Sequence, residues 1–312
     1  MRLRVIVEAI IMVIFLTTMA VFLLLGRGAI APISAQSVEE YMRRGDQNCK
    51  ASRLKFNDAA IQYREAIKLD PNLPDAHFKL AEIYYEFVWN YEALHELEAV
   101  EKIDPNYPGL YSLMGKLHHR MGDTDKALTV LQRAIALQPG DSEAHYYLGT
   151  IYQQKNMEDA AIGEYVKATE SRSDKEALLR SYLQLGRIYK GKKDDENAKE
   201  KLKKALSVDP KFIEAISELK DLYKQEAEGY KAKEKYDEAA QKYEEILKID
   251  PDNPDNIEVY MELGSIYRNK RLYDKAIAVY TAVTKLDPLN LDAFGALKEL
   301  RLLKSADSKG SG

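Results

Sequence analysis

Cysteine and tryptophan are almost absent from this chain. Cys49 is the only cysteine and Trp89 the only tryptophan among 312 residues. A single cysteine cannot form an internal disulfide, and the cysteine pairs of structural zinc sites are missing. Cysteine usage therefore leaves the redox compartment open.

The chain also lacks an excess of charge of one sign. It has 46 Lys and Arg against 50 Asp and Glu, giving a formal net charge of -4 and a pI near 5.9. Nucleic-acid-binding domains carry a basic patch or stripe. We therefore expect no nucleic acid among the partners.

Motifs of common enzyme classes are missing as well. The sequence has no G-x-x-x-x-G-K-[ST], no G-x-S-x-G and no H-E-x-x-H. His118 and His119 are adjacent, and neighbours on a helix point about 100° apart, which does not suit one metal ion. We predict a non-enzymatic protein with no metal and no cofactor.

Prolines at regular intervals are the most informative feature that is present. The dipeptides that recur are Asp70-Pro71, Asp104-Pro105, Gln138-Pro139, Asp209-Pro210, Asp250-Pro251 and Asp287-Pro288. The first three lie 34 residues apart, and the later gaps of 71, 41 and 37 fit the same period with one proline missing and short insertions. A fixed period of this length predicts a solenoid, whose repeats stack to bury their apolar faces.

Each period contains two amphipathic helices. In the third period, apolar residues recur at helical spacing over residues 110–121 and again over 127–135, with Gly122-Asp123 between them. Pro139 ends the second helix because it has no N–H donor. Small residues such as Gly115 stand where two helices must cross closely. The unit is a helical hairpin, and the fold class is all-α.

These positions resemble the tetratricopeptide repeat (TPR) family in spacing and in residue type. The last repeat shows the family pattern at Tyr260, Leu263, Gly264, Tyr267, Ala276, Tyr280 and Pro288. Another shows it at Tyr182, Leu185, Gly186, Tyr189, Ala198, Leu202, Ala205 and Pro210. The resemblance implies a right-handed superhelical solenoid of about seven hairpins over residues 38–290. His77 and His145 take an aromatic position of the repeat, so we expect them to pack.

Departures from the period keep the helical phase. Seven residues are added to the first helix of the repeat that ends at Pro251, so that helix should be about two turns longer than its neighbours. Three residues are added before Leu179 and before Ile257, about one turn each. Residues 291–304 should form a capping helix, and residues 305–312 a disordered polar tail.

The amino terminus carries the one long apolar segment, residues 5–25, preceded by Arg2 and Arg4. About 20 apolar residues span a bilayer, whereas a signal peptide's apolar core has about 7 to 15. We predict a transmembrane anchor over residues 1–26 and a linker over 27–37. The alternative is a signal cleaved after Ile33-Ser34-Ala35. The charge bias favours a cytoplasmic amino terminus, with the repeats on the periplasmic or another extracytoplasmic side.

Glu8 is the only charged residue within the apolar segment. It either lies near the membrane interface, neutralised by Arg4 one turn earlier, or contacts a membrane partner. The eleven residues from Arg27 to Ser37 reach at most roughly 40 Å. The repeats would therefore lie close to the bilayer.

In the TPR family, the first helix of each hairpin lines a concave protein-binding groove. Carrying the family's groove positions onto this sequence gives the predicted groove residues Asp75, Phe78, Glu82, Tyr85, Glu86, Lys116, His119, Arg120, Tyr146, Gln153, Arg180, Leu183, Arg187 and Lys190. They are acidic in the second repeat and basic in the third and fifth, which would orient an extended segment or a helix. The alternative is an ordinary solvated helix face.

Trp89 lies in an apolar hairpin turn with Phe87, Val88 and Tyr91, where the next hairpin has Gly122-Asp123. The aromatic side chain either packs onto the neighbouring hairpin or is an exposed edge contact for a partner or the headgroup layer.

The sequence predicts a membrane-anchored scaffold that holds subunits of a larger complex beside the membrane. The alternatives are a receptor or assembly factor that captures client proteins transiently in secretion, envelope biogenesis or import, and an accessory regulatory subunit of a membrane enzyme. The expected partners are other proteins, as extended segments, helices or subunits, together with the membrane through residues 5–25. Self-association stays open.

Overall fold

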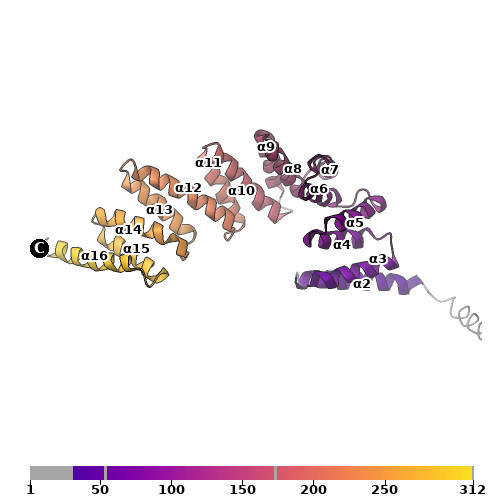
Figure 1. Cartoon of the computed structure of the whole chain (residues 1–312), viewed down its shortest axis with the longest axis horizontal. Coiled ribbons are helices and arrows are strands. Elements are labelled where there is room, and N and C mark those ends of the chain that lie inside the picture. Colours follow the sequence, from indigo (N-terminus) through magenta and orange to yellow (C-terminus); the bar gives the residue numbers. More distant parts are fainter. Residues whose placement is uncertain (1–30, 53–54, 172–173, 311–312) are drawn as a thin grey trace, which may run out of the picture. The chain divides into compact units, whose positions relative to one another are not determined.

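The computed structural model describes residues 31–52, 55–171 and 174–310 (Figure 1). These residues form fifteen α-helices and one short 3-10 helix, with no strand among them, and the all-α prediction is confirmed. The predicted anchor, residues 1–26, and Glu8 lie outside the described residues. Within the described ranges no helix is long and apolar enough to span a bilayer.

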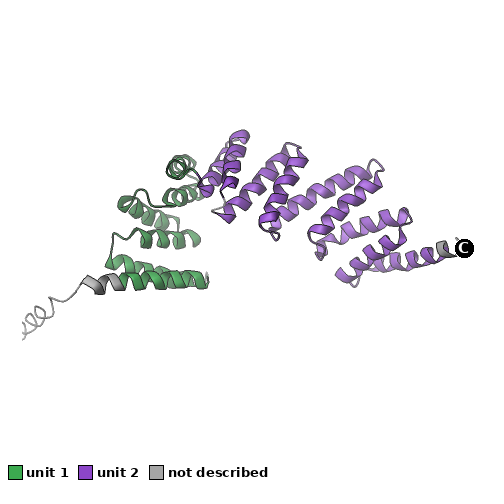
Figure 2. Ribbon diagram, turned by 180° about the vertical axis from the view of Figure 1, so that it is seen from behind, with its two compact units in different colours: residues 1–139 green, residues 140–312 purple. Residues whose placement is uncertain are grey.

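The helices pair into consecutive hairpins within two compact units, which meet in sequence at Pro139 and Gly140 (Figure 2). Unit 1 contains α2 (Ala31–Ala51) with α3 (Phe56–Leu69), α4 (Pro74–Glu86) with α5 (Asn90–Ile103), and α6 (Leu110–Met121) with α7 (Thr124–Leu137). Unit 2 contains α8 (Ser142–Gln154) with α9 (Glu158–Glu170), α10 (Lys175–Gly191) with α11 (Asp195–Val208), α12 (Ile213–Lys231) with α13 (Tyr236–Ile249), the 3-10 helix η2 (Pro254–Asn256), α14 (Ile257–Asn269) with α15 (Tyr273–Leu286), and α16 (Leu291–Gly310).

The recurring prolines follow the ends of the second helices. The backbone conformation and hydrogen bonds at these ends explain why aspartate precedes the proline. Asp70, Asp104, Asp209 and Asp287 each end a helix in an extended conformation, with φ between -140° and -132°. A residue before proline is restricted to this region. Each carboxylate also accepts a hydrogen bond from the backbone N–H two residues on, at 2.9 to 3.0 Å. These Asx turns start the connection to the next hairpin.

Two helix ends differ from the sequence-based expectation. Helix α2 begins at Ala31, inside the segment 27–37 expected to be a linker. Pro32 did not prevent this because proline is tolerated in the first turn of a helix. Helix α16 continues to Gly310, through most of the expected tail. Residues 305–309 contain neither proline nor glycine, so nothing local ends the helix before Gly310.

The predicted insertions lengthen individual helices. Helix α12 has 19 residues, against 13 in α8 and in α14, which confirms an extension of about two turns. Helix α10 has 17 residues. The three residues added before Ile257 form η2.

A close crossing between the two helices of a hairpin recurs along the chain. A Cβ atom added at Gly115 would lie 2.4 Å from Leu131 Cγ, and one at Gly186 would lie 2.8 Å from Leu202 Cγ. Gly149 faces Tyr165, and Gly264 faces Tyr280, at 2.7 Å. At contacts under 3 Å, a larger residue fits only if the facing side chain or the helices shift. The large side chains of the second helices therefore fix how closely each hairpin packs.

This crossing predicts the effect of enlarging one glycine. Gly186→Leu should lower the free energy of unfolding by about 1 to 3 kcal/mol, because the added side chain overpacks the contact with Leu202. The matched control is Gly163→Leu, since a Cβ there meets nothing within 4 Å. Urea denaturation followed by circular dichroism measures both. Equal stability of the two variants would contradict the assigned register.

Candidate protein-binding surface

Three predicted groove residues of unit 1 meet on the adjacent first helices α4 and α6. The Arg120 guanidinium carbon lies 3.1 Å from the Tyr85 ring centroid, and its Nη1 donates a hydrogen bond to the Tyr85 carbonyl oxygen at 2.5 Å. Lys116 Nζ lies 4.6 Å from the same ring centroid. Cations over an aromatic face are attracted by its quadrupole. Side chains of consecutive repeats therefore form one surface here.

The other end of α4 is tied to the connection before α6. The Phe78 ring centroid lies 4.9 Å from that of Tyr107, whose hydroxyl donates a hydrogen bond to Asp75 Oδ1 at 2.6 Å. Burial, followed by this hydrogen bond, raises the pKa of Tyr107. Tyr107 was not among the predicted groove residues, since it precedes the first helix of its hairpin.

Glu82 lies between these two contacts of α4 in the sequence, and Glu86 directly follows Tyr85. Glu82 and Glu86 are exposed, and His119 of α6 is half-buried. All three take part in interactions within the chain. The surface formed by Phe78, Glu82, Tyr85, Glu86, Lys116 and Arg120 is called the unit 1 surface below.

In unit 2, several predicted groove residues are used for packing. Tyr146 is 9% exposed, and its ring centroid lies 5.9 Å from that of Tyr165. Gln153 Oε1 accepts a hydrogen bond from the Tyr165 hydroxyl at 2.9 Å. Leu183 is 5% exposed and belongs to the core. Tyr146 and Leu183 therefore offer little area to a partner.

The predicted basic residues of α10 are paired within unit 2. Arg187 Nε and Lys190 Nζ both lie 2.8 Å from Glu218 of α12, and Arg180 pairs with Glu176 one turn earlier at 2.5 Å. Burial alone would raise the pKa of Glu218, but the hydrogen bonds from Lys190 and Arg187 outweigh it and hold the pKa below its ordinary value.

These pairs begin a series that sequence reasoning missed. Further pairs join Lys224 to Glu258 at 2.6 Å, Lys231 to Glu262, and Arg268 to Glu299 at 3.3 Å. In every pair of the series, including those of Glu218, the cation lies on the first helix of one hairpin. The carboxylate lies on the following first helix of the chain (α12 or α14) or on α16. The partners in the three further pairs are 31 or 34 residues apart, so a search for opposite charges at both of these separations would have found them.

Trp89 packs within its own hairpin and is partly exposed. Its ring centroid lies 5.3 Å from that of Phe87 and 5.7 Å from that of Tyr84, both on its own hairpin. Phe87, rather than Trp89, contacts the preceding hairpin through Phe56, at 6.3 Å. Trp89 is nevertheless 46% exposed, and Tyr91 is 78% exposed.

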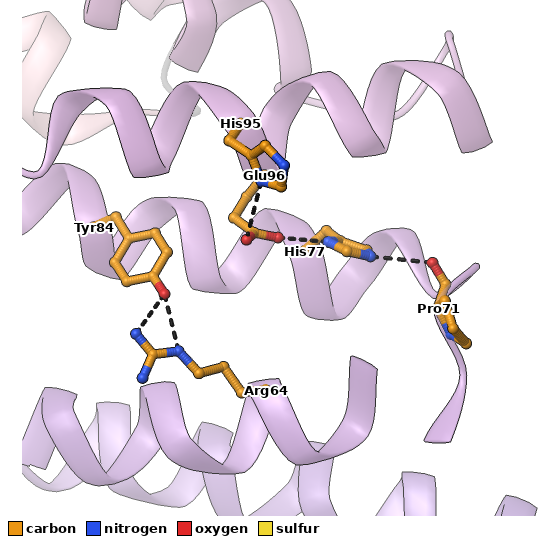
Figure 3. Close-up of polar contacts among 6 residues, drawn as sticks. All are labelled: Arg64, Pro71, His77, Tyr84, His95 and Glu96. Atoms are coloured by element: carbon orange, nitrogen blue, oxygen red, sulfur yellow. Dashed lines mark hydrogen bonds and ion pairs between the residues drawn. The ribbon is translucent and has the colours of Figure 1, made fainter. Parts of the chain in front are cut away.

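Two of the three buried histidines, His77 and His145, each bond a glutamate of the same hairpin. His77 Nδ1 lies 2.6 Å from Glu96 Oε2, and its Nε2 lies 3.1 Å from the Pro71 carbonyl oxygen (Figure 3). His145 Nδ1 lies 2.6 Å from Glu164. Across the described ranges, no group of three or more His, Cys, Asp or Glu side chains is arranged to hold a metal ion. Both histidines join the two helices of a hairpin.

The His77 pair predicts a pH dependence of stability. The hydrogen bond with Glu96 is the main cause that raises the pKa of His77. Protonated His77 therefore contributes stability that is fully present below the ordinary histidine value of about 6.5 and is lost as the pH rises through the raised pKa. We expect His77→Gln to lower the free energy of unfolding more at about pH 5.5 than at about pH 8.5. Urea titrations at both pH values measure this, and an equal loss at both would contradict an ionised pair.

Glu218 should contribute to stability by joining α10 to α12. Glu218→Gln should lower the free energy of unfolding by about 1 kcal/mol, because two charge-assisted hydrogen bonds weaken. Added salt should reduce this loss. The control is Glu214→Gln, at an exposed position of the same helix. Urea titrations at low and high salt distinguish the two, and a loss that salt leaves unchanged would argue against an ionic contribution.

Comparison with known proteins identifies the repeats. A family model described as TPR repeat matches residues 53–86, and models described as tetratricopeptide repeat match residues 113–175, 179–212 and 230–300. No curated protein gives a significant match to the chain.

Among solved structures, the C-terminal part of a TPR repeat-containing protein from Cytophaga hutchinsonii has the same fold. It is 18% identical, with a TM-score of 0.58, and the match covers 83% of this chain and 99% of that chain. MamA is 28% identical over 54% of this chain and 95% of its own, with a TM-score of 0.44. YrrB, a TPR protein with an unusual peptide-binding site, is 22% identical over 60% and 97%, with a TM-score of 0.43. The hairpins of this chain are therefore tetratricopeptide repeats.

Proposed function

We propose that this protein is a non-enzymatic scaffold that binds another protein through the unit 1 surface. TPR proteins generally mediate contacts between proteins. The observation that supports this site is the meeting of Tyr85, Lys116 and Arg120 from two consecutive repeats. Aromatic and arginine side chains are enriched among residues that dominate binding energy. With Glu82 and Glu86 exposed nearby on α4, the surface suits an extended segment or helix carrying both apolar and charged groups.

The internal ion pairs of unit 2 make the cations of α10 a poor site for a partner. A carboxylate of a partner could reach Arg187 or Lys190 only in competition with Glu218, which already bonds both. Such an exchange replaces one ion pair with another of similar strength, so little free energy is gained. The cations of α10 therefore contribute more to joining repeats than to attracting a partner.

The proposal includes an anchor in the membrane through residues 5–25, with the repeats on an extracytoplasmic side. Its support is the length of the apolar segment and the charges that flank it. Because α2 begins at Ala31, only residues 27–30 separate it from the predicted anchor, a reach of about 14 Å at most. Amino-terminal sequencing of protein extracted from membranes tests the anchor, and a mature chain that starts at Gln36 would contradict it.

A matched pair of charge reversals tests the binding surface. Glu82→Lys with Glu86→Lys should remove the partner that co-purifies at equal stoichiometry with the full chain in mild detergent, because both reversals lie on the unit 1 surface. Glu92→Lys with Glu98→Lys should retain it, since both residues are exposed on the second helix α5. Quantitative mass spectrometry measures the ratio, and circular dichroism melts confirm that both variants fold.

Two outcomes would count against this proposal. Retention of the partner by both variants would exclude the unit 1 surface as the site. If crosslinking in native membranes found only lipid and self-contacts with the unaltered chain, the scaffold function itself would be wrong.

A further inference from the structure

The carboxyl-terminal end of unit 2 has a groove that the described part of the chain leaves unfilled. It lies between α15 and α16, near the carboxyl terminus in Figure 1. Thr281 and Thr284 line it from α15, and Phe294, Lys298 and Arg301 are among the residues that line it from α16. Phe294 is 49% exposed, so the groove presents an aromatic side chain to solvent.

The repeat register shows what covers the equivalent face elsewhere in unit 2. Counted one period on from α14, Phe294 takes the position of Tyr260, and Lys298 takes the position of Gly264. In α14 this face is covered by its own second helix, with Tyr280 directly over Gly264. The groove is therefore the place where α16 would receive a second helix of its own.

Two cations in this groove indicate the charge of what it can bind. Lys298 and Arg301 are three residues apart, so they lie on the same side of α16. Both are exposed, and neither has an ion-pair partner among the residues the structure describes. Lys304, one turn further on, is already paired with Asp274. An occupant that supplies carboxylates would pair the two open cations.

The same cations argue against a second copy of this chain as the occupant. If two copies met symmetrically through this groove, each groove would face the other, so Lys298 and Arg301 of both copies would lie in one interface. Like charges brought together at an interface cost several kcal/mol. Lys298 also stands where the other repeats have glycine or alanine, so any helix that binds in this groove lies farther from α16 than the second helices lie within the hairpins.

We propose that this groove binds an amphipathic helix of another protein. Apolar side chains of that helix would contact Phe294 and Leu302, which is 64% exposed, and its carboxylates would pair with Lys298 and Arg301. This second surface lies in unit 2 and involves none of the residues of the unit 1 surface. The protein would then hold two partners at once.

Two synthetic amphipathic peptides of about 20 residues test the proposal. One has leucine on one face and glutamate on the other, and the second has lysine in place of every glutamate. Fluorescence anisotropy with the full chain should show tighter binding of the glutamate peptide by about tenfold. Lys298→Glu with Arg301→Glu should reverse this preference. Phe294→Ala should weaken binding of both peptides, because their shared leucine face loses its contact.

The matched control is Arg271→Glu with Lys285→Glu, which changes the net charge equally at exposed positions outside the groove. It should keep the preference of the unaltered chain. The proposal is overturned if the lysine peptide binds more tightly to the unaltered chain, or if the Lys298 and Arg301 reversals leave the preference unchanged. Self-association that Phe294→Ala abolishes in sedimentation would instead assign the groove to a second copy. Because Glu82 and Glu86 are untouched, failure here leaves the unit 1 proposal standing.

Discussion

Each hairpin depends on one crossing contact between a small residue and a large one. Gly115, Gly149, Gly186 and Gly264 each face a leucine or tyrosine sixteen residues later, under 3 Å from where a Cβ would stand. Where the glycine is replaced, Ala81 and Ala227 take its position and are fully buried. Because the two helices approach so closely at this point, the neighbouring apolar side chains must interlock in one register. The stacking of repeats then follows from hairpins of a common shape.

Much of this fold could be predicted because the responsible signals are local and periodic. An Asp-Pro step restricts the backbone wherever it occurs, and the inserted residues of α12 simply continue a helix that is already formed. The ends of α2 and α16 were harder to predict. Pro32 resembles a helix breaker in sequence but is tolerated in a first turn, and the polar stretch after Lys304 resembles a tail but continues the helix.

The sequence predicted which helix face carries the residues of the candidate site, but not which side-chain contacts those residues make. The register places Tyr85, Lys116 and Arg120 on adjacent first helices, and the structure brings them together. The repeat register cannot show which side chains form contacts within the chain. Glu218, which engages Arg187 and Lys190, belongs to the lengthened helix α12, so a family pattern built on repeats of equal length has no position for it. Spatial neighbours one period apart determine which charges remain for a partner.

Lys298 has a consequence for how the array could have grown. Tandem arrays can lengthen by duplication of whole hairpins, and each new hairpin needs a small residue where its two helices cross. With lysine at that position of α16, a second helix placed after α16 could not close onto it as the second helices of the other hairpins close onto their first helices. A further hairpin could therefore begin with α16 only if Lys298 were also replaced by a small residue.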